Sequence, residues 1–338
     1  MFIIKRSDNF DLNKFLQIVL ALFLFVYPIY QYFYSQKGRE YPVSLLGPYD
    51  TTIVNTSDIY DQLLDLKFSF LANAQPCRNN LAGILLVIIV STRPTNFANR
   101  IAIRKTWGKT VDSTKLVFLL GEADNITNQL LTEEIKLYGD IVQGNFIDAY
   151  KNLTYKHVMG LKWVTHHCPK AKYVLKTDDD IVVNIKEVWN YLGRVLSPFG
   201  AKSLINCHRY ENSLAQRNEN SKYQVTLDEY KDYYYPAYCG GWAIIYSQDV
   251  ISKLLEVAQS ISYFWIDDVQ ITGICAQKIG VPRKPLGNRI LTRDISESFL
   301  KLGPNYFGPF LFGPPDLTIY DILNTWDYLV KEKGTYTR

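Results

Sequence analysis

The chain has 338 residues, 47% of them hydrophobic, so it is long enough to bury one large core or two smaller ones. Its 37 lysine and arginine residues face 33 aspartate and glutamate residues, and the resulting net charge of +4 is too small for nucleic-acid binding through a basic surface. The 25 tyrosines and 17 phenylalanines suit a packed core and also flat, partly apolar ligands such as sugars, so composition does not choose between these uses.

Residues 15–34 form an uncharged, largely apolar run, which has the length of a helix that crosses a bilayer. Three basic residues precede the run and two follow it closely, so the charge bias toward a cytoplasmic N-terminus is slight. A cleaved signal peptide is the alternative, but it would have a shorter apolar core and a small-x-small cleavage site. We therefore predict a cytoplasmic tail at residues 1–14 and a single type II membrane anchor at residues 15–34, with the bulk of the chain lumenal.

Two weaker features agree with a lumenal location. Asn-x-Ser/Thr sequences, the acceptors of N-linked glycans, occur at Asn55, Asn125 and Asn152. The five cysteines show no CxxC spacing of a zinc ribbon, and in an oxidising lumen they would form two disulfides and leave one thiol. We expect the pairs Cys77–Cys168 and Cys239–Cys275.

Residues 35–80 lack sustained periodicity and are predicted to be a stem, and the pattern changes after them. Three continuous apolar runs are typical of strands buried on both faces, at residues 83–91, 115–121 and 172–176. Helix-like stretches accompany them at residues 96–106, 128–138 and 149–166. Strands alternating with helices at this spacing predict one α/β domain with a mostly parallel sheet over residues 81–338.

Three adjacent carboxylates, Asp178, Asp179 and Asp180, directly follow the third apolar run. They repel one another unless a multivalent cation or a ring of donors lies among them, and oxygen ligands suit Mg²⁺ or Mn²⁺. An exposed acidic turn or a helix N-cap cluster is the plainer interpretation. Because ligands of parallel α/β sheets bind outside the carboxyl ends of the strands, the position of the triplet favours a ligand site.

The familiar nucleotide-binding loops are absent from the sequence. No GxxxxGK[ST] follows a strand and no GxGxxG opens a helix, which disfavours P-loop and dinucleotide enzymes. Arg100 and Arg104 share one face of a predicted helix that Trp107 continues, so they suit a diphosphate and a flat base. Taken alone, a solvated basic face with a core tryptophan explains them more simply. Asp148 is explained well as the N-cap of the long helix at residues 149–166.

Two further patterns lie downstream. The paired glycines Gly240 and Gly241, directly before Trp242, let the backbone approach a ligand closely. Asp267 and Asp268 open an apparent helix, so plain N-capping explains them as well as a functional role does.

Six motifs occur in an order that resembles glycosyltransferase family 31, over residues 83–281. They are RIAIRKTWG, VFLLG, YGDIVQGNFIDAYKNLTYKHVMGLKWV, KTDDD, YPAYCGGWAIIYS and IDDVQITGICAQKIGV. That family contains β-1,3-galactosyltransferases and β-1,3-N-acetylglucosaminyltransferases of the Golgi. The resemblance implies a GT-A fold, a UDP-sugar donor, a divalent cation (usually Mn²⁺, otherwise Mg²⁺) and an inverting mechanism.

The resemblance also implies roles for the donor site. Asp178 and Asp180 would frame the metal and the diphosphate, with Asp180 the more direct ligand and Asp179 nearer the ribose or sugar. The cation would neutralise charge that develops on the departing UDP. The uridine and diphosphate pocket would be formed by Arg100, Arg104, Trp107, Asp148 and Lys156, with Lys176 beside them.

For the acceptor side, the resemblance implies that Asp268 is the general base. It would take the proton from the acceptor 3-hydroxyl as that oxygen attacks the anomeric carbon opposite UDP. Gly240, Gly241 and Trp242 would shape the sugar pocket, and Asp267 would orient the acceptor.

One feature departs from the family pattern. Members commonly carry a histidine near the C-terminus, ahead of a final tryptophan, that helps to hold the metal. The last histidine of this chain is His208, and the region ahead of Trp326 offers only Asp316 as an obvious substitute.

We therefore expect a β-1,3-glycosyltransferase in the Golgi membrane that moves a hexose, galactose first, from UDP to a glycan on a glycoprotein or glycolipid. Transfer of N-acetylglucosamine or N-acetylgalactosamine is the close alternative. A catalytically weak relative that acts as a binding or chaperone subunit is the alternative from a different class. The retained Asp178, Asp180 and Asp268 argue against that class, and the missing late histidine argues for it.

Overall fold

We describe a computed structural model of the chain, which defines residues 58–78, 83–109, 113–293 and 310–331. The predicted cytoplasmic tail and membrane anchor, the first part of the predicted stem and Asn55 lie outside these residues. Within the described ranges, no helix has the length and apolar character needed to span a bilayer.

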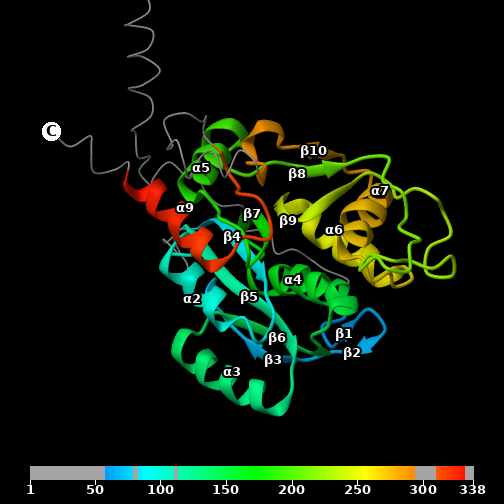
Figure 1. Cartoon of the computed structure of the whole chain (residues 1–338), viewed down its shortest axis with the longest axis horizontal. Coiled ribbons are helices and arrows are strands. Elements are labelled where there is room, and N and C mark those ends of the chain that lie inside the picture. The colour runs from blue at the N-terminus through cyan, green and yellow to red at the C-terminus, as the bar shows by residue number, and fades with distance from the viewer. Residues whose placement is uncertain (1–57, 79–82, 110–112, 294–309, 332–338) are drawn as a thin grey trace, which may run out of the picture. The chain divides into compact units, whose positions relative to one another are not determined.

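A mixed sheet of eight strands forms the centre of the described domain, in the order β10-β8-β9-β7-β4-β5-β6-β3 (Figure 1). The strands are β3 (Phe70–Asn73), β4 (Ile84–Ser91), β5 (Thr114–Glu122), β6 (Ile141–Ile147), β7 (Ala171–Asp178), β8 (Ile205–Tyr210), β9 (Tyr238–Ser247) and β10 (Arg283–Pro285). Neighbours among β7, β4, β5 and β6 are parallel, as are β8 and β10. Because β9 is antiparallel to β7 and β8, and β3 to β6, the predicted mostly parallel sheet is in fact mixed.

Helices cover both faces of this sheet and explain its apolar strands. One face packs against α4 (Leu153–His167), α6 (Gln248–Ser260) and the π-helical segment η5 (Asp268–Cys275). The other face packs against α2 (Phe97–Lys105), α3 (Asn125–Tyr138), α5 (Ile185–Asn190) and α9 (Ile319–Lys331). Shorter elements are β1 (Gln62–Leu63), β2 (Leu66–Lys67), η3 (Tyr150–Asn152), η4 (Tyr191–Leu196), α7 (Ala276–Lys278) and η6 (Gly287–Arg289). The three predicted strands and three predicted helices are all present, as β4, β5, β7, α2, α3 and α4.

The boundary predicted between stem and domain is wrong. Residues 58–78, assigned to the stem, belong to the folded domain, because β3 pairs with β6 at one edge of the sheet. A disulfide from Cys77 to Cys168 ties the same segment to the end of α4, as expected. The segment alternates little and contains only short strands, which explains why its periodicity is weak in the sequence.

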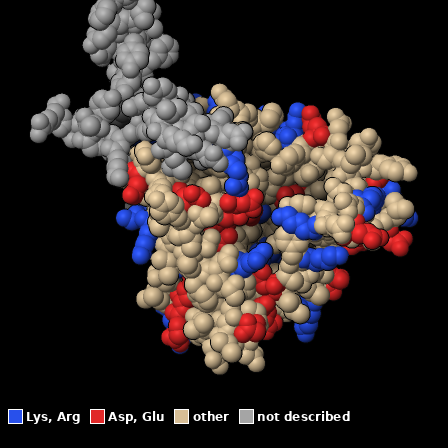
Figure 2. All heavy atoms as spheres, viewed as in Figure 1, with Lys and Arg blue, Asp and Glu red and all other residues tan. Residues whose placement is uncertain are grey.

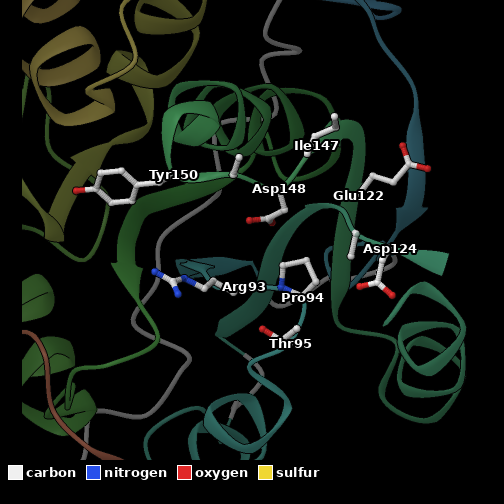
Figure 3. A pocket seen from close by; sticks show the side chains of 10 residues that line it. Arg93, Pro94, Thr95, Glu122, Asp124, Ile147, Asp148 and Tyr150 are labelled. Carbon is white, nitrogen blue, oxygen red and sulfur yellow. The ribbon is translucent and has the colours of Figure 1, made fainter. Parts of the chain in front are cut away.

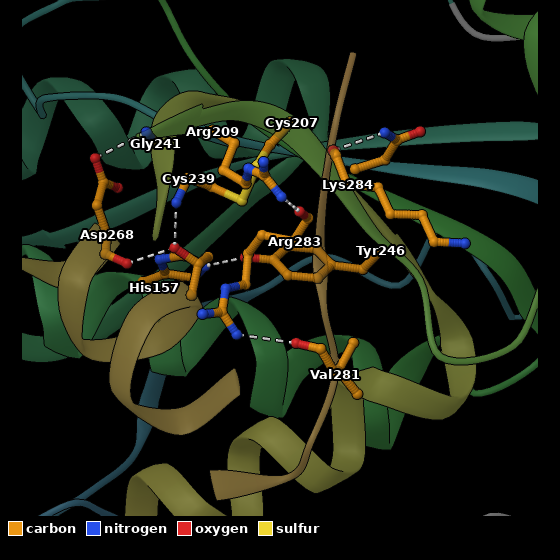
Figure 4. Close-up of a disulfide and its surroundings, with 12 residues drawn as sticks. His157, Cys207, Arg209, Cys239, Gly241, Tyr246, Asp268, Val281, Arg283 and Lys284 are labelled. Atoms are coloured by element: carbon orange, nitrogen blue, oxygen red, sulfur yellow. Dashed lines mark hydrogen bonds between the residues drawn. A yellow bond between two sulfur atoms is a disulfide. The ribbon is translucent and has the colours of Figure 1, made fainter. Parts of the chain in front are cut away.

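The second predicted disulfide is also wrong. Cys239 pairs with Cys207 rather than with Cys275, which is buried as a free thiol (Figure 4). β8 and β9 are neighbouring antiparallel strands, so their cysteines lie with Cα atoms 5.6 Å apart. This pairing depends on the strand order, which sequence spacing does not reveal.

The surface charges are mixed. On the face seen in Figure 2, acidic and basic side chains of the described residues are interspersed with a larger area of other residues. This distribution agrees with the small net charge of the whole chain, +4.

Candidate active site

A cavity of about 690 Å³ opens at the carboxyl ends of β4, β5 and β6 (Figure 3). The loops that follow these three strands line it, through Arg93, Pro94, Thr95, Glu122, Ala123, Asp124, Ile147, Asp148, Ala149 and Tyr150. Its volume lies in the range of small-molecule sites, and strand ends of this kind are where α/β sheets bind ligands. The cavity is therefore the best candidate for a nucleotide-sized ligand in the described part of the chain.

Sequence reasoning missed two of the residues that line this cavity. Arg93 is exposed and lies just after β4, where its guanidinium is available to an anionic ligand. Tyr150 presents an exposed ring at the start of η3, which suits contact with a flat group. Arg93 could have been found from its position just after the predicted strand at residues 83–91, whereas Tyr150 follows β6, which is not among the predicted strands.

Asp148 and Lys156 hold the floor of the cavity together. Asp148 does not cap the long helix as predicted, because an extra turn, η3, precedes α4 and Asn152 occupies the N-cap position. Instead, Asp148 Oδ2 accepts a hydrogen bond from the Gly121 amide (2.7 Å) and pairs with Lys156 Nζ (2.8 Å). The buried Lys156 also donates to the carbonyl of Thr92 (2.7 Å), so the pair joins the loops after β4, β5 and β6.

Arg100, Arg104 and Trp107 do not line the cavity. The five N–H donors of the buried Arg100 are taken by Glu134, by Thr92 and by the carbonyls of Arg93 and Pro94. Arg104 binds Glu134 and Asp140, and the Trp107 indole is buried and donates to the Ile181 carbonyl. The two arginines therefore stabilise the loop after β4 and the neighbouring helix rather than lining the cavity. Of the simpler alternative, the solvated basic face is wrong, because both arginine side chains are largely buried, and the core position of Trp107 is confirmed.

The three carboxylates of the aspartate triplet have different surroundings. Asp178, at the end of β7, is partly exposed and its Oδ1 accepts from Lys176 Nζ (2.9 Å). Asp179 is buried, and its Oδ2 accepts from Thr92 Oγ1 (2.5 Å) and Asn96 Nδ2 (2.8 Å), so this carboxylate anchors the loop after β4. The Oδ1 atom of Asp180 is buried and has no hydrogen-bond partner among the described residues.

Asp180 has the properties of a cation ligand. Burial raises the pKa of its carboxyl to about 7, and the negative charges of Asp178, Asp179 and Asp316 add to this effect. Asp316, the suggested substitute for the family histidine, is exposed, and the next residue donates its backbone N–H to the Asp180 carbonyl (Leu317, 2.8 Å). The described residues contain no cluster of three or more acidic, histidine or cysteine side chains arranged to hold a metal. The unpartnered Oδ1 of Asp180 and the partly exposed carboxylate of Asp178 are oxygen donors of the kind that a divalent ion takes.

Lys176 connects the aspartate triplet with the Asp267–Asp268 pair. Its buried ammonium lies 2.9 Å from Asp178 Oδ1, 2.6 Å from the Gly241 carbonyl and 3.9 Å from Asp267 Oδ2. Burial would lower the pKa of Lys176, but the charges of Asp178 and the Asp267–Asp268 pair raise it above its usual value. One permanent positive charge thus lies between two acidic groups that are about ninety residues apart in sequence.

Asp267 is held from behind by a histidine that sequence reasoning missed. His157 Nδ1 donates to Asp267 Oδ2 (2.9 Å), and Tyr246 Oη donates to His157 Nε2 (3.2 Å). Burial would raise the pKa of Asp267, but Lys176 and His157 hold it below its usual range, while burial lowers the pKa of His157. Asp267 is thus an ionised support rather than an open ligand for a substrate. The sequence signal is a histidine in the buried middle of α4, because a buried imidazole requires polar partners.

Asp268 is the carboxylate best placed for chemistry. Its Oδ2 accepts a hydrogen bond from the Gly241 amide (2.8 Å), and its Oδ1 is buried without a partner in the described part of the chain (Figure 4). Burial, followed by the nearby charge of Asp267, raises the pKa of Asp268 well above its usual value. A carboxylate with a raised pKa and a free oxygen is the kind of group that accepts a proton in catalysis.

The two glycines of β9 are required by close contacts. A Cβ atom at Gly241 would lie 2.1 Å from Asp268 Oδ1, and one at Gly240 would lie 3.0 Å from the Trp242 indole nitrogen. The partly buried Trp242 lies near His208, with ring centroids 5.9 Å apart. The glycines therefore make room for Asp268 and for an aromatic wall beside it.

Replacing Gly241 by alanine is expected to lower catalytic turnover about 100-fold or more, because the new methyl group would displace the Asp268 carboxylate. The matched control is Gly193→Ala, since a Cβ atom there would meet nothing within 4 Å. Turnover is measured for the reaction that the family resemblance implies, as release of UDP from a UDP-hexose, and thermal melting checks that both variants fold. Comparable turnover in the two variants would contradict the required fit between Gly241 and Asp268.

The predicted glycosylation sites differ in accessibility. Asn125 is exposed at the first turn of α3, whereas Asn152 is partly buried and its amide donates to the Ile147 carbonyl (2.9 Å). Asn125 is therefore the more accessible acceptor of these two.

The chain is similar to several known glycosyltransferases. A family profile described as galactosyltransferase matches residues 98–287. The chain is 31% identical over 302 residues to the lactosylceramide 1,3-N-acetyl-beta-D-glucosaminyltransferase of Mus musculus, covering 83% of this chain and 77% of the relative. It is 37% identical over 221 residues to beta-1,3-galactosyltransferase 1 of Homo sapiens, covering 63% of this chain and 66% of the relative. Among solved structures, a galactosyltransferase LgtC in complex with donor and acceptor sugar analogues matches with a TM-score of 0.34 and 10% identity, over 68% of this chain and 86% of that one.

Proposed function

The chain belongs to the galactosyltransferase family, and on this premise we propose that it is an inverting β-1,3-glycosyltransferase. It moves a hexose from a UDP-sugar to the 3-hydroxyl of a glycan on a glycoprotein or glycolipid. The observation that carries the proposal is the position of Lys176 between Asp178 and Asp267, which joins the donor and acceptor halves of one site. Galactose is the preferred sugar, and N-acetylglucosamine or N-acetylgalactosamine is the alternative. The named relatives include a galactosyltransferase and an N-acetylglucosaminyltransferase.

The donor UDP occupies the cavity at the ends of β4, β5 and β6 in this proposal. Tyr150 contacts the uracil or ribose, and Arg93 neutralises the diphosphate, while Asp148, Lys156 and Asp179 hold the surrounding loops. Asp178 and Asp180 hold Mn²⁺ or Mg²⁺, an ion that, when bound, stabilises negative charge on the leaving diphosphate. The mixed sheet with a cavity at its parallel strand ends supports the GT-A fold as part of the same proposal.

Asp268 acts as the general base. Its free Oδ1 takes the proton of the acceptor 3-hydroxyl while that oxygen forms a bond to the anomeric carbon and the bond to the UDP oxygen breaks. A single displacement from the face opposite UDP inverts the anomeric centre, so one base is sufficient. Lys176 and His157 keep the neighbouring Asp267 ionised, and its charge keeps Asp268 a strong proton acceptor.

The cellular context completes the proposal. Residues 15–34 anchor the chain in the Golgi membrane as a type II protein, with the described domain in the lumen. The disulfides Cys77–Cys168 and Cys207–Cys239 support this context, because disulfides persist in oxidising compartments.

A binding or chaperone subunit with weak catalysis is the second candidate, favoured by the missing late histidine and by the exposure of Asp316. The two functions are separated by incubating the purified full chain with UDP-galactose, UDP-N-acetylglucosamine or UDP-N-acetylgalactosamine on a glycan acceptor array. We expect UDP release and product with UDP-galactose that require Mn²⁺ or Mg²⁺ and stop when the ion is chelated. A folded chain that turns over none of these donors would instead support the binding subunit.

A further inference from the structure

The segment between β8 and β9, residues 211–237, is an ordered unit beside Asp268. The Arg217 guanidinium donates to four backbone carbonyls within the segment, those of Val225, Thr226, Tyr230 and Asp232, at 2.7 to 3.0 Å. Backbone hydrogen bonds from Ala215 to Tyr233 (2.8 Å) and from Tyr235 to Ser213 (2.9 Å) close it further. A segment that satisfies its own backbone in this way presents its side chains in fixed positions.

The segment is fixed to the part of the chain that carries the proposed base. Its residues Ala215, Val225 and Tyr235 form a separate apolar cluster with Phe264, Trp265 and Val269, which flank Asp267 and Asp268. On its other side, Glu229 lies 3.6 Å from Lys151 of η3, next to Tyr150 of the donor cavity. The segment therefore spans from the donor cavity to the base.

Three partly exposed tyrosine rings lie along this span. Tyr150 is 40% exposed, Tyr210 is 39% exposed and Tyr223 is 47% exposed. The rings of Tyr150 and Tyr223 have centroids 6.4 Å apart, and Tyr210 stacks on Tyr238 at 5.3 Å. Burial raises the pKa of Tyr150, Tyr210 and Tyr238, and the charge of Asp268 adds to this effect for all three.

These rings match the surface of a sugar. A hexose has an apolar face of C–H groups and an edge of hydroxyls, and a tyrosine offers an apolar ring with a hydroxyl at its tip. Sites of this kind combine aromatic walls with a few fixed polar groups, here the Asp268 carboxylate, whose Oδ1 has no hydrogen-bond partner among the described residues, and the Trp242 indole. We propose that Tyr223 and Tyr210, presented by the ordered segment 211–237 and the end of β8, bind the terminal hexose of the acceptor glycan and set acceptor specificity.

This inference rests on the proposed function, but binding of the sugar does not require catalysis. The first test is therefore saturation-transfer NMR on the full chain with methyl β-galactoside and methyl β-N-acetylglucosaminide, in the presence of UDP. We expect saturation transfer to one of these sugars, and a loss of about fivefold to tenfold in affinity for Tyr223→Ala or Tyr210→Ala. Tyr223→Phe keeps the aromatic ring, so its affinity for the sugar should stay close to that of the unchanged chain.

The matched control is Tyr233→Ala, on the same segment, because this side chain is 77% exposed and lies outside the ring pairs described above. In the transfer assay, the acceptor KM should rise for Tyr223→Ala while the donor KM stays within twofold. No binding of either sugar, or equal affinity in Tyr223→Ala, Tyr210→Ala and Tyr233→Ala, would overturn the inference. Sugar binding without any UDP release would keep this subsite and refute the proposed transferase instead.

Discussion

Replacing Asp268 by asparagine is expected to lower the rate of sugar transfer by about 10²- to 10⁴-fold, the usual contribution of a general base. Asparagine has nearly the same shape, and its amide oxygen can still accept the hydrogen bond from the Gly241 amide. It cannot take the proton of the acceptor hydroxyl. Binding of UDP with Mn²⁺ should persist, because the donor cavity is lined by other residues, and calorimetric titration of UDP measures this directly.

The pH dependence gives a second readout of the same prediction. Since burial and Asp267 raise the pKa of Asp268, the base is protonated at low pH and becomes active as pH rises through that value. The kcat/KM of the unchanged chain should therefore increase with pH on the acidic side of its pH profile, and the kcat/KM of Asp268→Asn should not. Asp228 is an exposed aspartate on the neighbouring segment, so Asp228→Asn is the control. It should keep both the transfer rate and the pH dependence of kcat/KM. Normal transfer by Asp268→Asn would remove Asp268 as the base.

The sequence predicts the framework of this site better than its interior. β4, β5 and β7 read as apolar runs because helices cover both of their faces, and the loops after them are then expected at one edge. Asp178 and Asp180 lie at the end of β7, at this edge, whereas Asp268 lies at the start of η5 and follows none of these strands. What lies at the strand ends can thus be predicted from hydrophobic pattern and position along the chain.

The partners of individual charges cannot be predicted in the same way. Nothing local to Arg100 indicates that Glu134, on another helix, consumes its donors, and nothing local to Lys176 indicates that it bridges to Asp267. Both pairs depend on the three-dimensional arrangement of helices and strands. The same holds for Cys239, whose partner is set by the pairing of β8 with β9. Motif spacing therefore points to the strand ends, but it does not show which motif residues have their donors taken by other side chains.

A buried ion pair near the start of the described domain is expected to contribute strongly to its stability. Asp58 and Lys162 form a buried ion pair that fastens the segment before β1 to α4. Asp58 also accepts hydrogen bonds from His166 Nε2 (2.8 Å) and Gln259 Nε2 (2.9 Å), and Lys162 donates to the Ile59 carbonyl (2.8 Å). Because burial lowers the pKa of Lys162, its ammonium depends on the nearby carboxylate to remain charged.

Asp58→Asn is therefore expected to lower the free energy of unfolding by about 3 to 5 kcal/mol, because it leaves a buried ammonium without its counter-charge. For a domain of this size, that loss corresponds to a fall of roughly 6–15 °C in Tm, measured by scanning calorimetry at pH 7. Asp61→Asn, an exposed aspartate in the same segment, should change stability by less than about 0.5 kcal/mol. The double variant Asp58→Asn/Lys162→Met removes both charges and should be more stable than Asp58→Asn alone.

The dependence on pH tests whether the lost charge is the cause. Hydrogen bonds from His166 and Lys162 outweigh burial and hold the pKa of Asp58 below its usual value, so the folded chain keeps this carboxylate charged to lower pH than the unfolded chain does. The stabilisation is then fully present above the unfolded pKa of about 3.9 and is lost as pH falls through the lower folded value. The difference in Tm between the unchanged chain and Asp58→Asn should accordingly be largest near neutral pH and shrink below about pH 4. A difference that does not change over this range would show that altered packing or hydrogen bonding, and not the ion pair, fastens residues 58–78 to the domain.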